Sequence, residues 1–374
     1  MCRRGVSGWG ALPEAAPGSD VAVIGAGVVG LAVAHRLAGS GKRVVVVEKE
    51  KGPGMGVTAG QANVIHVIQL PFGSLKSKLA RRGNHMYDDL CRELGVRLNR
   101  MPALLLVNRW LAVPVLLAAF AYVKLELGKE FRVSLMRGSS LRKAEPSLAM
   151  GVIGGLKVDG YGTVDVNELV SRLADASTAR GVTFRFGCKV TSADAREEAV
   201  TLKTSCGEIR ARVVVNAAGL YSDEVAAAFG VDLGRLEPGL GVMAVCSGLS
   251  LRCIVAPLPL GTGSKTKGGA LIPATDGTTI VGPTLRVTQS KEDRAYTEED
   301  MAQLTAKFAP LLREGWKTVR VYAGTRPLSP TRDFIIDYRP QKRVVNLVGI
   351  ESPGLTAAPA IAEMVERMIA GSDQ

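Results

Sequence analysis

The sequence predicts an α/β protein that combines a mainly parallel sheet with an inserted, mainly antiparallel one. Three stretches predict the parallel sheet, because each joins a short apolar run to a turn of small residues and then to a helical segment: Val21–Lys49, Arg212–Ser222 and Val344–Ala370. Between the last two, Leu240–Val321 alternates apolar runs with turn residues, which is typical of an antiparallel sheet. The chain of 374 residues is long enough for two domains.

The first stretch has the glycine spacing of a Rossmann-like dinucleotide-binding turn. Gly25 allows the tight turn, Gly27 lets the backbone approach a diphosphate, and Gly30 lets the helix pack closely on the strand. The free N–H groups at the start of the helix would face the diphosphate. Glu48 follows Gly25 by about 20 positions, where a carboxylate accepts hydrogen bonds from ribose hydroxyls. A tight strand–helix turn without a ligand is the alternative interpretation.

A glycine-rich loop and a helix follow. Gly52–Gly60 is expected to be the loop, and Val64–Ile68 is an apolar run with His66 at its centre. Ser74–Leu94 has apolar residues at helical spacing, and Gly95 is expected to end this helix.

The middle of the chain predicts a second helix and several short strands. Asp165 is a suitable N-cap for a helix that runs to about Arg180, and Asp159–Gly162 is expected to contain turns. Four strands are expected to form an antiparallel meander: Thr183–Phe186, Lys189–Ser192, Ala199–Thr204 and Glu208–Arg210.

Composition and charge narrow the class of protein. With 47% hydrophobic and 22% charged residues, the chain is globular. Its net charge is +12, but the Lys and Arg residues are dispersed and aromatic residues make up only 5%. No nucleic-acid partner is therefore expected. A small anionic substrate or an anionic membrane surface explains the charge.

Three features bear on where the protein works. Six scattered cysteines form no CxxC pair, so we expect reduced, mostly buried thiols, no metal site and a cytoplasmic protein. Residues 1–19 lack the apolar core of a signal peptide and are expected to be a loose leader. The longest apolar patch, Leu111–Tyr122, contains Pro114 and is too short to span a bilayer. It is either a buried helix, the simpler interpretation, or a peripheral contact with lipid at the inner face of the membrane.

Several motifs together resemble a known superfamily. GAGVVG with VVVVEK, VVNAAGLYSD and GIESPGLTAAPAIAEMV are similar to motifs of the FAD-dependent D-amino-acid oxidase and glycerol-3-phosphate dehydrogenase superfamily. Within it, ANVIH, GSLKSKLARRGN, DGYGTVDVNEL, TKGGALIPATDGTTIVGPT and AGTRPLSPTRDFIID look most like prokaryotic FAD-dependent glycerol-3-phosphate dehydrogenase and its neighbour, L-2-hydroxyglutarate dehydrogenase. The resemblance spans Asp20–Gly371.

The sequence departs from these relatives in three places. Relatives often continue into a cysteine-rich domain beyond the point that corresponds to Gln374, so a separate electron-accepting subunit is expected. The turn Gly349–Pro353 lacks the lysine of the membrane-bound glycerol-3-phosphate enzymes. Ile68–Leu70 lacks the tyrosines that hydroxyglutarate enzymes show after VIH.

The resemblance implies two domains and FAD as the cofactor. Residues 20–97, 150–235 and 322–374 would form the FAD-binding domain, and residues 98–149 and 236–321 the substrate, or cap, domain. The start of the last helix would direct its N–H groups at the negative charge of the reduced flavin. The residues expected to contact FAD are Gly25, Ala26, Gly27, Val28, Val29, Gly30, Glu48, Lys49, Thr58, Ala59, Gln61, Ala62, Val190, Ala217, Ala218, Gly219, Gly324, Arg326, Gly354, Leu355 and Thr356.

His66 is the candidate catalytic base. Imidazole takes a proton near neutral pH, and this residue follows the loop that would run beside the flavin. The alternative is a core histidine bonded to backbone groups. The other two histidines, His35 and His85, lie on predicted helices and are expected to be structural or exposed.

Arginine and lysine side chains are the candidate anchors for an anionic substrate. Arg326 offers a planar guanidinium fork to a phosphate or carboxylate close to the flavin, and is also predicted to be part of the catalytic site. Arg332 is a second candidate, or else it pairs with Asp333 or Asp337 on the surface. Two lysines of the SKTKGG loop would hold phosphate as point charges or form a solvated turn: Lys265 and Lys267.

The function implied by the resemblance is oxidation of sn-glycerol 3-phosphate to dihydroxyacetone phosphate, with hydride transfer to flavin N5. Electrons would then pass to a quinone or to a separate subunit. The nearest alternative is an L-2-hydroxyglutarate dehydrogenase or oxidase, and an amino-acid oxidase of the same fold comes third. Two alternatives from other classes are a non-catalytic FAD-dependent scaffold and a basic nucleic-acid binder, and the dispersed charge argues against the latter.

Overall fold

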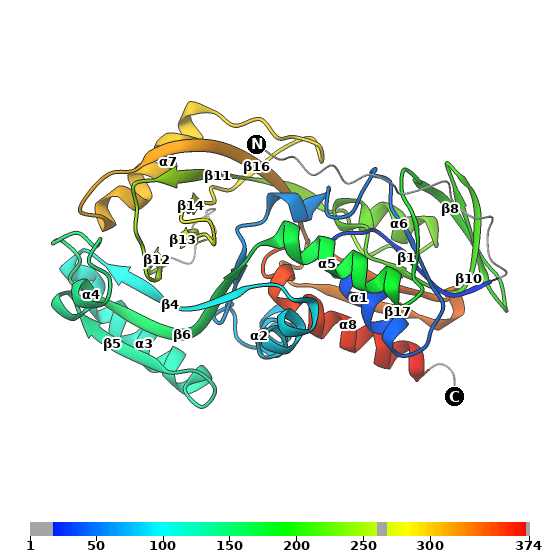
Figure 1. Ribbon diagram of the computed structural model, residues 1–374, viewed down its shortest axis with the longest axis horizontal. Coiled ribbons are helices and arrows are strands. Elements are labelled where there is room, and N and C mark those ends of the chain that lie inside the picture. Colours follow the sequence, from blue (N-terminus) through cyan, green and yellow to red (C-terminus); the bar gives the residue numbers. More distant parts are fainter. Residues whose placement is uncertain (1–17, 260–267, 372–374) are drawn as a thin grey trace.

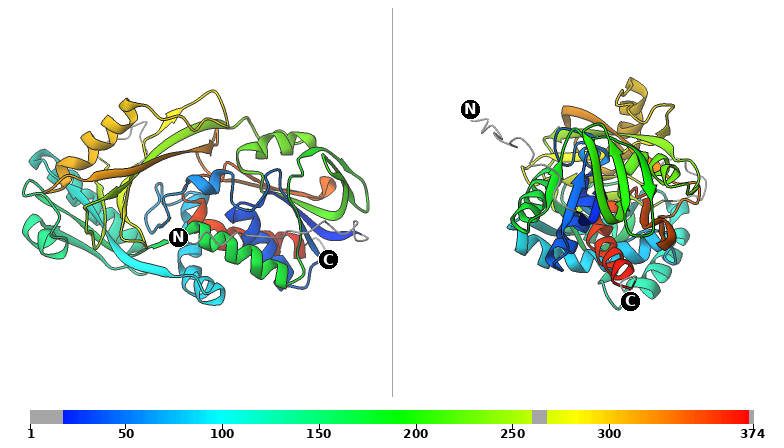
Figure 2. Two further views of the ribbon diagram at one scale, coloured as in Figure 1. Left: turned by 45° about the horizontal axis from the view of Figure 1, so that its top comes forward. Right: turned by 90° about the vertical axis from the view of Figure 1, so that its right-hand side faces the viewer.

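The computed structural model describes residues 18–259 and 268–371, and this part of the chain forms two lobes, built on sheets of eight and ten strands (Figure 1). In Figure 1 and in the left view of Figure 2, blue, green and red segments make one lobe, and cyan, yellow and orange segments dominate the other. Most of the predicted leader and the loop with Lys265 and Lys267 lie outside the described residues.

The eight-stranded sheet has a parallel core in the order β18–β10–β1–β2–β7, which confirms the predicted α/β class. Val23 lies between Val46 and Val215, and all three are fully buried, as expected for parallel strands covered on both faces. The core strands are β1 (Ser19–Ile24), β2 (Val44–Val47), β7 (Thr183–Arg185), β10 (Gly207–Asn216) and β18 (Val344–Val348); β8 (Val190–Ala195), β9 (Val200–Thr204) and β17 (Ile335–Arg339) pair antiparallel at the edges.

Four helices share one apolar core with this sheet, and their ends follow the predicted signals. At the start of α2, the Ser74 side chain accepts the N–H of Ser77, and at its end Gly95 has a left-handed φ of +66°. Asp165 caps the start of α5. The opposite face of the sheet packs on α6 (Ser222–Ala228). The four helices are α1 (Val28–Gly39), α2 (Leu75–Leu94), α5 (Val166–Ala179) and α8 (Gly354–Ala370).

The ten-stranded sheet is mainly antiparallel, as predicted for the inserted part. β6 pairs with β3, β4 and β5, and β11 pairs with β14, β15 and β16. The elements of this lobe are β3 (Val64–Ile65), β4 (Leu98–Val107), β5 (Val133–Arg137), β6 (Gly154–Val164), β11 (Glu237–Ser247), β12 (Ile254–Pro257), β13 (Ala270–Pro273), β14 (Thr279–Gly282), β15 (Arg286–Val287) and β16 (Lys317–Leu328), with α3 (Val113–Leu127), α4 (Gly138–Ala144) and α7 (Glu298–Phe308).

Three predictions of local structure are wrong. Thr183–Arg185 is not part of the meander but extends the parallel core, because it pairs with β2. Glu208–Arg210 and Arg212–Val215 are one strand, β10, which joins the antiparallel β8–β9 pair to the core. Asp159–Gly162 contains no chain reversal, since Gly160 takes a φ of +93° within the long strand β6.

The ten-stranded sheet also reaches further along the chain than the predicted domain limits. The sequence places Gly154–Val164 in the FAD-binding domain (150–235). In the structure it is strand β6, which pairs with β4 and β5 of the ten-stranded sheet. The end of Lys317–Leu328, assigned to 322–374, stays paired with β11. Both strands are long and cross from one lobe to the other, which single-strand patterns do not reveal.

The apolar patch Leu111–Tyr122 belongs to an exposed helix rather than a buried one. Helix α3 continues to Leu127, and Pro114 lies in its first turn, where proline starts a helix instead of breaking it. Among the described residues, one window, Trp110–Leu127, is long and apolar enough to cross a membrane by length and composition, and 22% of it is buried.

Candidate functional site

A cavity of about 410 Å³ opens at the carboxyl ends of the parallel strands, where open α/β sheets bind their ligands. Ile24 and Val47, the last residues of β1 and β2, form part of its wall. Many of the residues predicted to contact a dinucleotide lie in this wall: Gly25, Gly27, Val28, Val29, Glu48, Lys49, Thr58, Gln61, Val190, Ala217, Ala218, Gly219, Gly354 and Leu355.

The turn after β1 is so tightly packed that two of its glycines admit no side chain. A Cβ on Gly30 would lie 2.0 Å from the carbonyl oxygen of Gly25, and one on Gly25, whose φ is +107°, would lie 2.4 Å from that of Ala217. The turn after β1 therefore touches the turn after β10, in which Ala217 lies. Ala26 is fully buried and donates its N–H to Glu48 Oε2 (2.7 Å). Ala26 and Gly30 thus belong to the turn but do not line the cavity.

Two helices begin at this cavity, and neither is capped by the side chain of its N-cap residue. These residues are Gly27 for α1 and Pro353 for α8. Thr58 accepts the N–H of Val28 (3.1 Å), and the other N–H groups of the first turns give each helix start a partial positive charge. Together with apolar wall residues such as Leu347, these features fit a dinucleotide with flat rings and a diphosphate.

His66 is held against the start of α8. Its N–H donates to Thr356 Oγ1 (3.0 Å), and its carbonyl accepts Asn84 Nδ2 of α2 (2.9 Å). Its ring meets the ring of Tyr161 edge to face, with 6.2 Å between the centroids. Burial raises the pKa of Tyr161 to about 12, so this phenol stays neutral beside the imidazole. Both backbone groups of His66 are therefore fixed, while its side chain is only partly buried.

Arg326 lies on β16, a strand that packs against the loop before His66. Because side chains alternate between the two faces of a strand, Tyr322, Gly324 and Arg326 of β16 lie on the same face. Tyr322 donates its hydroxyl to the carbonyl of Gln61 (3.0 Å), and a Cβ on Gly324 would lie 2.7 Å from the Cα of Gly60. The strand thereby packs against the loop that precedes His66. Burial lowers the pKa of Arg326, and the opposite charge of Glu351 in the turn before α8 counteracts this shift.

A buried lysine completes this cluster of charges. Lys76 Nζ lies 3.8 Å from Glu351 Oε1, and both side chains are 5% exposed. The Lys76 ammonium also donates to the carbonyl of Arg332. Two cations, Lys76 and Arg326, thus interact electrostatically with one carboxylate, Glu351, in the turn before α8.

The other predicted substrate and cofactor residues lie further out. Arg332 is exposed, in the turn after β16. Its predicted surface partners are engaged elsewhere: Asp333 accepts the N–H groups of Leu75 and Lys76 at the start of α2, and Asp337 pairs with Arg339. Ala59 is exposed, and Ala62 packs on the core of the ten-stranded lobe.

Sequence reasoning missed several residues of the site. Lys76, Asn84, Tyr161 and Glu351 hold or surround His66 and Arg326. Lys76 and Asn84 lie on the buried face of α2 with Ala80 and Tyr87. A lysine and an asparagine at helical positions otherwise occupied by apolar residues are the signal in the sequence that indicates them. The rim residues gave no such signal, because long-range folding brings them to the cavity: Lys189, Thr191, Tyr221, Glu292 and Arg294.

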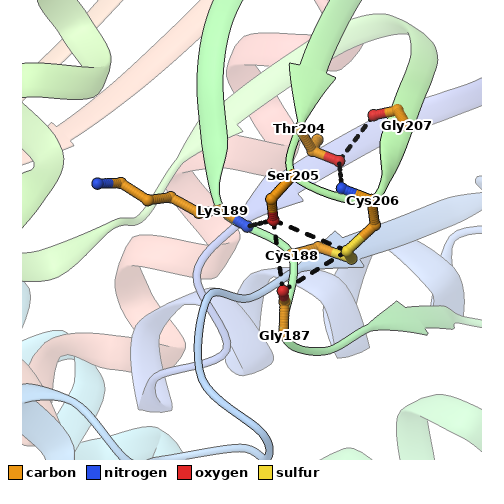
Figure 3. Close-up of a disulfide and its surroundings, with 7 residues drawn as sticks. All are labelled: Gly187, Cys188, Lys189, Thr204, Ser205, Cys206 and Gly207. Carbon is orange, nitrogen blue, oxygen red and sulfur yellow. Dashed lines mark hydrogen bonds between the residues drawn. A yellow bond between two sulfur atoms is a disulfide. The ribbon is translucent and has the colours of Figure 1, made fainter.

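The expectation that all cysteines are reduced is wrong for one pair. Cys188 and Cys206 form a disulfide that joins the start of β8 to the turn between β9 and β10 (Figure 3). Cys188 lines the cavity together with Lys189 and Val190. The other described cysteines are buried free thiols, and burial raises the pKa of each to about 11, which leaves them protonated and unreactive: Cys91, Cys246 and Cys253.

Comparison with known proteins gives the family. Residues 20–368 match the family described as FAD dependent oxidoreductase, and the chain belongs to this family. The protein is therefore an FAD-dependent oxidoreductase, and the shape and lining of the cavity fit FAD.

Two relatives and one solved structure are among the most similar. The chain is 28% identical over 364 residues to glycerol 3-phosphate dehydrogenase of Caloramator mitchellensis, covering 92% of this chain and 72% of that protein. It is 27% identical over 428 residues to mitochondrial L-2-hydroxyglutarate dehydrogenase of Arabidopsis thaliana, covering 97% and 85%. Dithionite-reduced L-alpha-glycerophosphate oxidase from Mycoplasma pneumoniae with FAD bound aligns with a TM-score of 0.86 at 24% identity, covering 95% of each chain, and shows the same fold.

Reduction of the Cys188–Cys206 disulfide is expected to lower the free energy of unfolding by about 3 kcal/mol, because the bridge closes a loop of roughly 18 residues. FAD should also bind more weakly, since Cys188 lines the cavity. Urea unfolding and flavin titration, each with and without a phosphine reductant, measure both effects. The double variant Cys188→Ser/Cys206→Ser is the control and should not respond to the reductant. Equal stability of the wild type in both buffers would contradict the prediction.

Proposed function

We propose that this oxidoreductase oxidises sn-glycerol 3-phosphate to dihydroxyacetone phosphate. Two observations support the proposal. His66, the candidate base, is bonded through its backbone N–H to Thr356 in the first turn of α8, and the charge of Arg326, the candidate anion anchor, interacts with that of Glu351 in the turn before α8. The relative from Caloramator mitchellensis, a glycerol 3-phosphate dehydrogenase by name, supports this choice of substrate.

The reaction removes a hydride from C2 of the substrate and a proton from its C2 hydroxyl. Bound FAD supplies the acceptor for the hydride. The imidazole of His66 takes the hydroxyl proton, and the two backbone bonds of His66 keep that imidazole in position. The guanidinium of Arg326 binds the phosphate, with Lys76 adding positive charge. The electrons then leave to a quinone or to a separate electron-accepting protein.

L-2-hydroxyglutarate is the second candidate substrate, favoured by the relative from Arabidopsis thaliana. The two substrates need different arrangements of charge, because a phosphate dianion binds clustered donors and a dicarboxylate binds two separated ones. Lys76 and Arg326 both act on Glu351 and are therefore clustered. This arrangement favours the phosphate.

Anaerobic mixing of the FAD-loaded protein with each candidate substrate tests the proposal directly. We expect sn-glycerol 3-phosphate to bleach the flavin absorbance, and L-2-hydroxyglutarate and glycine to leave it unchanged. A photoreduced sample shows the full extent of bleaching and serves as the positive control. Bleaching by hydroxyglutarate or glycine, but not by glycerol 3-phosphate, would make the substrate assignment wrong. A flavin that no hydroxy or amino acid substrate reduces would instead indicate a non-catalytic scaffold.

Replacing His66 by glutamine is expected to lower kcat about 10²–10⁴-fold, the usual contribution of a general base. KM should change little, and FAD content should stay the same, because the bonds to Thr356 and Asn84 use backbone groups of His66. Steady-state kinetics and the flavin spectrum check this. His85→Gln, on the outer side of α2 beside Glu130, is the matched control and should keep the activity of the wild type. Equal losses in both variants would indicate a structural role only.

Replacing Arg326 by lysine is expected to raise KM for glycerol 3-phosphate about tenfold or more. The reason is that the fork loses at least one hydrogen bond to a charged group, worth about 1.5–3 kcal/mol. Arg332→Lys is the comparison variant for the exposed second candidate, and we expect a smaller effect from it. A KM that rises only in Arg332→Lys would reassign the phosphate anchor to that residue.

A further inference from the structure

The outer side of α3 and of the short 3₁₀ turn that precedes it, Trp110–Ala112, carries large apolar side chains although it faces solvent. Trp110, Leu111 and Leu125 are 76%, 93% and 80% exposed. Six of the thirteen large apolar side chains that are exposed in the described residues belong to this one segment, so they form a patch rather than scattered positions. We call these six side chains the α3 patch: Trp110, Leu111, Val115, Leu117, Tyr122 and Leu125.

Packing within the protein does not account for the patch. The inner side of α3 is a separate stripe of buried residues, Leu116, Val123 and Leu127, which packs on the core of the ten-stranded lobe. These positions recur at helical spacing and hold the helix in place. A surface helix normally has a polar outer face, whereas the outer side of α3 combines large apolar side chains with the charged Lys124 and Glu126. The outer stripe therefore fits an apolar environment outside the protein.

The connections of α3 fix it along the lobe rather than across a membrane. It links β4 to β5, and both of these strands pair with β6, so α3 is the crossover helix of one sheet. Figure 1 shows it lying along β5 and β6. The sheet covers its inner side, and only its outer side can enter lipid. This is the geometry of an interfacial helix that lies in the plane of a bilayer surface.

The charge around the patch selects the kind of bilayer. Residues 108–143 contain seven Lys and Arg residues but only two acidic ones, so this short segment supplies a large part of the net charge of +12. Arg109 precedes the patch, and Lys124 and Glu126 lie on either side of Leu125; all three are exposed. Of the acidic residues, Glu130 is already bonded to Arg81 and His85. Exposed cations beside an apolar face complement anionic lipid headgroups.

We propose that the α3 patch docks this protein on the surface of an anionic lipid bilayer. The patch is continuous with the loop that carries His66: the ring of Tyr122 contacts the ring of Phe72, with 5.2 Å between the centroids, and Leu70 of the same loop is 45% exposed. The bilayer surface thus lies beside the loop between β3 and α2. The inference is independent of the substrate proposed above.

Vesicle flotation of the full-length, FAD-loaded protein tests the docking. We expect binding to vesicles of phosphatidylcholine with phosphatidylglycerol, weaker binding to phosphatidylcholine alone, and loss of binding at high salt. Leu111→Glu/Leu125→Glu should weaken binding about tenfold or more, because two anchoring side chains become charged. Val319→Glu, at a 62% exposed apolar residue of β16, is the control and should bind like the wild type. Equal binding of both variants, or no binding to either vesicle, would overturn the proposal.

Two further readouts keep the test decisive. Trp110 fluorescence should shift to the blue on anionic vesicles, and Trp110→Phe should abolish that shift. This measurement does not depend on the folding of a variant with added charges. Light scattering of the wild type and of Leu111→Glu/Leu125→Glu examines self-association. A wild-type dimer that this variant separates would mean that a second copy covers the patch, and the bilayer proposal would fall. Flavin bleaching by substrate is measured in parallel, so that failure of the docking is distinguished from failure of the proposed activity.

Discussion

The close approach of α2 to the start of α8 is the contact on which the site depends. A Cβ on Gly83 of α2 would lie 2.0 Å from the carbonyl oxygen of Thr356, so a larger residue there would push the helices apart. At this distance the hydroxyl of Tyr87 reaches the carbonyl of Leu355 (2.6 Å), and Asn84 reaches the carbonyl of His66. Thr356 in turn accepts the N–H of His66. The two helices therefore act as one support for the candidate base, and groups that would be costly to bury unpaired are bonded across their contact.

Buried charges of both signs lie beside this support. Lys76 and Arg326 would each be costly to bury alone, and Glu351 between them reduces that cost. Asp333 ties the same end of α2 to the turn after β16, because a carboxylate at a helix start is stabilised by the N–H groups and the dipole. Two cations, Lys76 and Arg326, and two carboxylates, Glu351 and Asp333, therefore lie between α2, β16 and the turn before α8.

The sequence predicts the parts of this molecule whose signals are local. The glycine turn, the valine strands and the caps of α2 and α5 need only neighbouring residues, and all were predicted close to their observed limits. What it does not predict is set by partners distant in the chain. Thr183–Arg185 extends the parallel core because it pairs with β2, and Cys188 meets Cys206 because β8 and β9 pair antiparallel. Glu351 looked like an ordinary turn residue, and only the fold brings it to Lys76.

The α3 patch and the site share one piece of structure, the loop from His66 to Ser74. Phe72 of this loop packs on the same core as the inner stripe of α3, while the backbone of His66 is bonded to α2 and α8. The inner stripe of α3 packs on the core, whereas the outer stripe leaves apolar area exposed to water. A bilayer removes that area from water without moving the helix. In the proposed docking, the lipid surface would lie next to the loop that positions the candidate base, because Tyr122 of the α3 patch contacts Phe72 of that loop.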